Sequence, residues 1–212
     1  MNAEGVVKYA SRLLPGPPPD ASVVAALNRV RTELHELGLV GSEPDGTGYG
    51  NLSIRDGAGF WVTGSGTGRL RRLEPRHYTR VETADPERNR VVARGAVPAS
   101  AEAMTHAAVY AASPAAGAVF HVHSAALFGW LLHAGCPATA ADIPYGTPAM
   151  ARAVAALVSA APSLPLLFAM AGHEPGAVAC GADVQSTRGA LLSAYEEAKR
   201  HDENRTDRRQ RA

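Results

Sequence analysis

The stretch from Pro98 to Ser124 constrains the chain most, and at its centre stands His121-Val122-His123. The residues just before it, Ala116 to Phe120, are small or apolar and follow a proline, a pattern typical of a buried strand. Side chains alternate between the two faces of a strand, so His121 and His123 point to the same face. Two imidazoles on one face of a rigid strand are a candidate pair of metal ligands. The alternative, one core and one surface histidine, does not fit that alternation.

A carboxylate precedes this histidine pair in the same unit. Glu102 sits near the start of a predicted helix over residues 101–112, with Ser100 as its candidate N-cap. One carboxylate and two histidines in one helix-and-strand unit indicate a metal with an acid/base beside it. His106, four residues further on, shares the helical face of Glu102 and could orient it, although core packing is the simpler role.

Composition excludes several classes of protein. The formal net charge of +1 over 212 residues gives no electrostatic case for binding nucleic acid or a membrane surface. No apolar run is long enough to span a bilayer, and the first residues lack the pattern of a signal peptide. Cys136 and Cys180 form no recognisable spacing pattern, so we expect reduced thiols in a cytoplasmic protein.

The order of motifs predicts one domain with two appendages. A proline-rich run closes an N-terminal arm over residues 1–20, a single domain follows over 21–200, and residues 201–212 form a polar tail that we expect to be disordered. Periodicity and turn residues predict helices over 24–37, 101–112, 125–133, 149–159 and 183–200, and strands over 50–55, 60–63, 78–83, 90–93, 116–123, 164–170 and 178–180.

A loop of small residues, Thr63 to Gly68, is a candidate anion site. It offers backbone N–H groups and hydroxyls without bulky side chains, which suits a phosphate. An ordinary connecting loop has the same composition. Arg69, Arg71 and Arg72 follow directly, and we favour a solvated basic face for them over a part in anion binding.

These motifs, in this order, resemble the class II aldolase/adducin family over about residues 21–198. The matching signatures are Gly-Asn-Leu-Ser at 50–53, Thr-Gly-Ser-Gly at 63–66, Glu102, His-Val-His at 121–123 and the later His173. The interval from the glutamate to the histidine pair and the late histidine make the combination specific.

The resemblance implies an α/β fold, a three-layer α/β/α sandwich with a largely antiparallel central sheet. It implies that His121, His123 and His173 hold a divalent metal, most often Zn²⁺, with Mn²⁺, Co²⁺ or Fe²⁺ as alternatives, and that Glu102 is the acid/base. Further residues at matching positions would bind the substrate phosphate: Gly50, Asn51, Ser65, Gly66 and Ser100. It also implies a homotetramer with sites between subunits, and Tyr145 is a candidate for a catalytic tyrosine supplied to a neighbour.

The activity implied by the resemblance is that of a lyase in carbohydrate metabolism. It would cleave or form a C–C bond in a small sugar phosphate or related hydroxy-carbonyl compound, through an enediolate that the metal stabilises. Epimerisation or dehydration of a sugar phosphate at the same site is the alternative, and a non-haem iron oxygenase and a non-catalytic adducin-like binding domain are minor ones. Ala101 stands where sugar-phosphate enzymes of the family carry a serine, which leaves an unphosphorylated substrate open.

Overall fold

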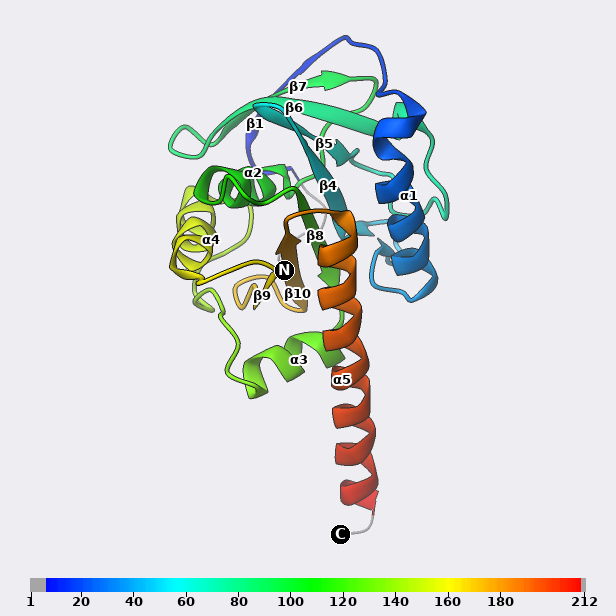
Figure 1. Ribbon diagram of the computed structural model, residues 1–212, viewed down its shortest axis with the longest axis vertical. Coiled ribbons are helices and arrows are strands. Elements are labelled where there is room, and N and C mark those ends of the chain that lie inside the picture. Colours follow the sequence, from blue (N-terminus) through cyan, green and yellow to red (C-terminus); the bar gives the residue numbers. More distant parts are fainter. Residues whose placement is uncertain (1–6, 211–212) are drawn as a thin grey trace.

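An eight-stranded sheet organises residues 7–210, the part of the chain that the computed structural model describes (Figure 1). Its strand order is β1-β7-β6-β5-β4-β8-β10-β9, and every neighbouring pair is antiparallel except β1 with β7. The strands are β1 (Ala10–Leu14), β4 (Asn51–Asp56), β5 (Gly59–Thr63), β6 (Tyr78–Asp85), β7 (Arg90–Gly95), β8 (Ala118–His123), β9 (Leu166–Ala169) and β10 (Gly176–Gly181). The short strands β2 (Gly41–Ser42) and β3 (Gly48–Tyr49) pair separately. The mixed, mostly antiparallel sheet agrees with the predicted α/β class.

Helices cover the two faces of the sheet in two groups, as Figure 1 shows. Helices α2 (Ala103–Ala112) and α4 (Pro148–Ala160) pack with one set of strand side chains. Helices α1 (Ala21–Glu36), α3 (Ala125–His133) and α5 (Val184–Gln210) pack with the other set. A 3-10 turn over Pro75–His77 leads into β6. Among the described residues, no helix combines the length and hydropathy that a bilayer span requires.

The side chains of strand β8 point alternately into the two cores of the protein. Phe120 and Val122 belong to the core under α1, α3 and α5. Val119 belongs to the opposite core. His121 and His123 therefore share the face of the sheet that α2 and α4 cover, as the alternation predicted. Ser124 then accepts a hydrogen bond from the backbone N–H of Leu127 and caps α3.

Several boundaries differ from the sequence-based prediction. The predicted arm contributes an edge strand, because residues 10–14 of β1 pair in parallel with β7; residues 1–6 lie outside the described part. Helix α1 ends at Glu36, so Leu37 falls outside the apolar stripe and is exposed, and Gly38 adopts a positive φ just after it. Helix α2 begins at Ala103, not at 101.

Residues 201–210 are helical, where the sequence led us to expect a disordered tail, and residues 211–212 lie outside the described part. Helix α5 continues through them to Gln210, and Figure 1 shows its last turns extending away from the sheet. The segment lacks proline and glycine, so nothing in it interrupts the helix that begins at Val184. Polar composition alone predicted disorder and did not weigh this continuity.

Candidate metal centre and adjoining pocket

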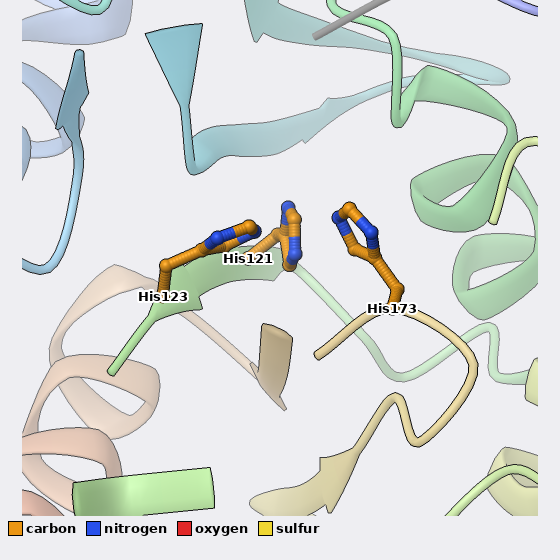
Figure 2. A group of neighbouring side chains, drawn as sticks. All are labelled: His121, His123 and His173. Atoms are coloured by element: carbon orange, nitrogen blue, oxygen red, sulfur yellow. The ribbon is translucent and has the colours of Figure 1, made fainter. Parts of the chain in front are cut away.

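Three histidines from two elements converge on one point. His121 and His123 project from β8, and His173 comes from the loop between β9 and β10 (Figure 2). Their ring centroids are 4.8 Å apart for His121 and His123, 5.2 Å for His121 and His173, and 5.0 Å for His123 and His173. One potential ligand atom of each lies within 4.8 Å of the others. The structure thus brings together the three side chains that the resemblance assigned to a metal.

A glycine lets the loop approach the strand this closely. Gly176 is paired with His123 across the sheet, and its N–H donates to the carbonyl of His173 over 2.7 Å. A Cβ at this position would lie 2.6 Å from that carbonyl oxygen and 3.0 Å from Nε2 of His121. Any larger residue would push the late histidine away from the pair.

Burial keeps the three imidazoles neutral. Loss of solvation lowers the pKa of His123 to about 4 and that of His173 to about 3, and it holds the pKa of His121 well below its usual range. Neighbouring imidazoles add to the effect on His121 and His173, because two positive charges at this spacing repel. A neutral imidazole keeps a lone pair for a cation, so the donor set suits a divalent metal with open coordination positions.

Glu102 is buried at the start of α2 with one oxygen held. Its side chain is 3% exposed, and Oε2 accepts a hydrogen bond from Oγ1 of Thr105 over 2.5 Å. Oε1 has no hydrogen-bond partner among the described residues. Burial raises the pKa of Glu102 to about 7, while the Thr105 hydrogen bond and the charge of Lys8 oppose the rise. A carboxyl with this pKa can both give and take a proton near neutral pH.

One pocket gathers the other predicted site residues. A cavity of about 320 Å³ is lined by Gly50, Asn51, Ser65, Gly66, Ser100, Glu102 and Tyr145, together with glycines and threonines of two loops. The three histidines are not among its lining residues. Two lining residues nevertheless contact them: Nδ2 of Asn51 lies 3.4 Å from Nδ1 of His121, and the ring of Tyr145 lies 4.2 Å from that of His173. The cavity and the histidine cluster are therefore adjacent.

The loop from Gly64 to Gly68 forms one wall of this pocket. The N–H of Ser65 donates to the carbonyl of Pro98 over 2.8 Å, and the Thr67 hydroxyl donates to the carbonyl of Gly64 over 2.7 Å. None of the three arginines that follow lines the pocket, and the exposed Arg71 forms an ion pair with Glu36. For Arg71, this agrees with the solvated basic face that the sequence favoured.

Tyr145 is buried in its own chain. It is 1% exposed and its ring lies against that of His173, while a catalytic contribution to a neighbouring subunit stays a prediction. Nζ of Lys8 lies 3.5 Å from the centroid of its ring.

Three residues near the site were missed by sequence reasoning. Lys8 sits on Tyr145 with its charge near Glu102 and His173. Tyr9 donates its hydroxyl to the carbonyl of Ser100 over 2.7 Å. Arg31 is 3% exposed and donates to the loop beside the pocket. Of the three, only Arg31 could have been noticed in the sequence, as a basic residue next to the apolar stripe of α1.

Fold and site together define an α/β protein in which a cluster of three histidines, able to hold a metal ion, lies beside a pocket. The chain matches the family model described as the class II aldolase and adducin N-terminal domain over residues 32–199, and it belongs to that family. Among curated proteins it is similar to a methylthioribulose-1-phosphate dehydratase from Leptospira borgpetersenii, with 35% identity over 106 residues, 45% of this chain and 42% of the relative. The match therefore spans less than half of that relative's length.

Solved structures show the same fold. An L-fuculose-1-phosphate aldolase from Thermus thermophilus superposes with a TM-score of 0.67 at 24% identity, covering 89% of this chain and 97% of that one. A sugar-phosphate aldolase from Thermotoga maritima gives a TM-score of 0.60 at 17% identity over 84% of this chain and 94% of that one. At these identities the likeness concerns the fold and not the substrate.

Proposed function

We propose that the protein is a divalent-metal-dependent lyase that cleaves or forms a C–C bond in a small sugar phosphate or related hydroxy-carbonyl compound. The observation that carries this proposal is the convergence of His121, His123 and His173 next to a pocket that contains Glu102. A binding module has no need of three neutral imidazoles beside a carboxyl with a raised pKa. The helices on both faces of the sheet also support the three-layer α/β/α arrangement.

The three imidazoles would hold the cation, and we favour Zn²⁺ because it accepts three nitrogen ligands and keeps a position open. When bound, such an ion polarises the carbonyl and hydroxyl oxygens of a chelating substrate. The residues fit it: all three rings are buried, neutral and mutually close.

The chain's own groups supply binding and proton transfer. Backbone N–H groups of Gly66, Thr67 and Gly68, with the hydroxyl of Ser65, would bind a phosphate at one wall of the pocket. In aldol cleavage the bond between the carbon next to the carbonyl and the hydroxyl-bearing carbon breaks. The hydroxyl proton passes to solvent water as the aldehyde forms, protonated Glu102 delivers a proton to the other carbon, and Glu102 then regains a proton from solvent.

Dehydration is the second candidate, favoured by the similarity to a methylthioribulose-1-phosphate dehydratase. In that reaction ionised Glu102 would remove the proton from the carbon next to the carbonyl, and hydroxide would leave from the following carbon. Both reactions, and epimerisation, begin from the same bound hydroxy-carbonyl group. The site therefore supports chemistry on a bound hydroxy-carbonyl compound in general. It supports less firmly the choice of which bond of that compound breaks.

The test combines a metal assay with a substrate screen. Elemental analysis of the purified protein should find about one divalent metal per chain, lost in His173→Ala and kept in the control His133→Ala, an exposed histidine of α3. L-Fuculose 1-phosphate, methylthioribulose 1-phosphate and unphosphorylated ketoses should then be scored separately for aldehyde release, water loss and epimer formation. Absence of metal uptake and of turnover would favour the adducin-like binding domain, and oxygen consumption with iron would favour an oxygenase.

We further propose a cytoplasmic homotetramer, on the basis of the family resemblance. Sedimentation of the purified protein tests the assembly, and a monomer with full activity would contradict the need for it.

A further inference from the structure

A ladder of polar side chains runs from the pocket into the core between β4 and α2. Asn51, Ser53 and Arg55 share one face of β4, while Glu102 at the N-cap of α2 and His106 and Tyr110 within it recur every four residues. Two strand residues advance by about 6.6 Å and one turn of four helical residues by about 6 Å, so the two series stay in step.

Each rung of this ladder is visible in contacts or position. Asn51 and Glu102 both line the pocket and form its first rung. In the second rung Oγ of Ser53 lies 2.6 Å from Nδ1 of His106, and it also lies 2.8 Å from the hydroxyl of Tyr110. Arg55 closes the ladder, donating from Nη2 to the carbonyl of Tyr110 over 2.9 Å.

The hydrogen bonds of the second rung determine which nitrogen of His106 carries the proton. His106 is fully buried, and burial lowers its pKa to about 3, so the ring is neutral with one donor and one acceptor nitrogen. Among the described residues, Ser53 is the one hydrogen-bond partner of the Tyr110 hydroxyl. If Tyr110 donates to Ser53 and Ser53 donates to Nδ1, every hydroxyl proton is used and Nε2 carries the N–H. The reverse order would leave the Tyr110 hydroxyl proton buried without an acceptor.

The first rung of the ladder lacks hydrogen-bond donors, and the Nε2–H of His106 can help to supply them. Oε1 of Glu102 and Oδ1 of Asn51 are buried acceptors without a hydrogen-bond partner among the described residues, and Nε2 of His106 lacks one too. His106 lies one helical turn after Glu102 and is bonded to Ser53, which follows Asn51 on the same face of β4, so the ring adjoins the first rung. One water accepts one such bond and donates two, which is the number these three atoms need.

We propose that His106 is a positioning residue, whose Nε2–H binds a buried water that donates to Oε1 of Glu102 and Oδ1 of Asn51. The relay Tyr110–Ser53–His106 thereby fixes the carboxylate whose proton transfer the proposed function requires, and the catalytic part of this inference rests on that function. Thr105 holds one oxygen of Glu102 and the bridged water holds the other. His106 itself touches neither substrate nor metal.

The tautomer of His106 is tested without any substrate. Two-bond ¹H–¹⁵N spectra of the ¹⁵N-labelled, metal-free protein should show His106 protonated at Nε2 in the wild type. Ser53→Ala should mix the two tautomers. An Nδ1–H tautomer in the wild type would overturn the proposal whatever the enzyme's reaction.

The link to Glu102 is tested with two variants of one position. Gln places an amide nitrogen near the site of Nε2, whereas Phe keeps the ring and removes both nitrogens. At one fixed pH above 8, the carboxyl ¹³C shift of Glu102 should move in His106→Phe and return in His106→Gln. With a substrate found by the screen above, kcat should fall about 10- to 100-fold in His106→Phe with KM and metal content kept, and His106→Gln should restore most of it.

A purely structural role for His106 gives a different pattern. The control Val109→Ala, buried on the same helix, measures the effect of lost stability alone. If His106→Phe and His106→Gln lose activity in parallel, or no more than Val109→Ala at equal stability, the positioning role is wrong. Unmoved ¹³C shifts in both variants would refute the link to Glu102 even if no substrate were turned over.

Discussion

The ring of Tyr145 lies 4.2 Å from the ring of His173 in the same chain, with interplanar angle 34°. Lys8 lies on the ring of Tyr145 with Nζ 3.5 Å from its centroid. The tyrosine is thus fixed against the late histidine and also lines the pocket. This contact joins the N-terminal segment, the pocket and the histidine cluster.

Tyr145→Phe separates the role of the hydroxyl from that of the ring. Phenylalanine keeps the packing against His173, so metal content and melting temperature should change little. If the hydroxyl takes part in proton transfer, kcat should fall about 10²-fold, within the range of general acid–base groups. Tyr145→Ala should instead lose about 3 kcal/mol of stability and part of the metal, because it opens a cavity beside the histidine. Equal turnover in Tyr145→Phe and wild type would limit the residue to packing.

Glu102 makes the stability of the metal-free protein depend on pH. Its pKa rises from 4.5 to about 7 on folding, so proton uptake stabilises the folded state fully below pH 4.5. That contribution, about 3 kcal/mol, is lost as the pH rises through about 7. Glu102→Gln is neutral at every pH, so the variant should gain in stability relative to wild type between pH 5 and pH 8.5. Urea unfolding at both pH values measures this, and a constant difference would contradict the raised pKa.

Lys8→Met should move the pH profile of the reaction. The charge of Lys8 lowers the pKa of Glu102, so its removal raises that pKa further above the usual value. The limb of the kcat profile that reports Glu102 should shift to higher pH. Lys8→Arg keeps a charge and should leave the limb in place, and Lys199→Met is a distant control on α5. A limb that does not move in Lys8→Met would show that the charge does not act on the carboxylate.

The sequence predicted the parts of the site that depend on local pattern. The shared face of His121 and His123 follows from strand alternation, and the two neighbouring strands hold it. The position of His173 could be expected only from the family resemblance, because a loop histidine carries no periodicity. Lys8 escaped prediction since it lies in an irregular segment just before β1, which has no pattern of its own, and its contact with Tyr145 spans 137 positions.

Arg31 supports the loop beside the pocket, and its replacement should weaken anion binding. The guanidinium is buried and donates to the carbonyls of Thr67 over 3.1 Å, Gly68 over 2.9 Å and Arg71 over 2.9 Å, and also to that of Leu70. Arg31→Met removes all these donors and should cost about 3 kcal/mol, because buried carbonyls lose their partners. Arg31→Lys should recover only part, since one ammonium cannot span the carbonyls that a planar fork reaches.

The same two variants test whether this loop binds phosphate. Thr67 and Gly68 line the pocket, so a displaced loop should raise the dissociation constant of inorganic phosphate about tenfold. Arg71→Met is the matched control, because its exposed ion pair with Glu36 contributes little to stability. Calorimetric titration of the folded variants, below their unfolding temperatures, measures the binding. If Arg31→Met binds phosphate as the wild type does, the anion site lies elsewhere in the pocket and an unphosphorylated substrate gains support.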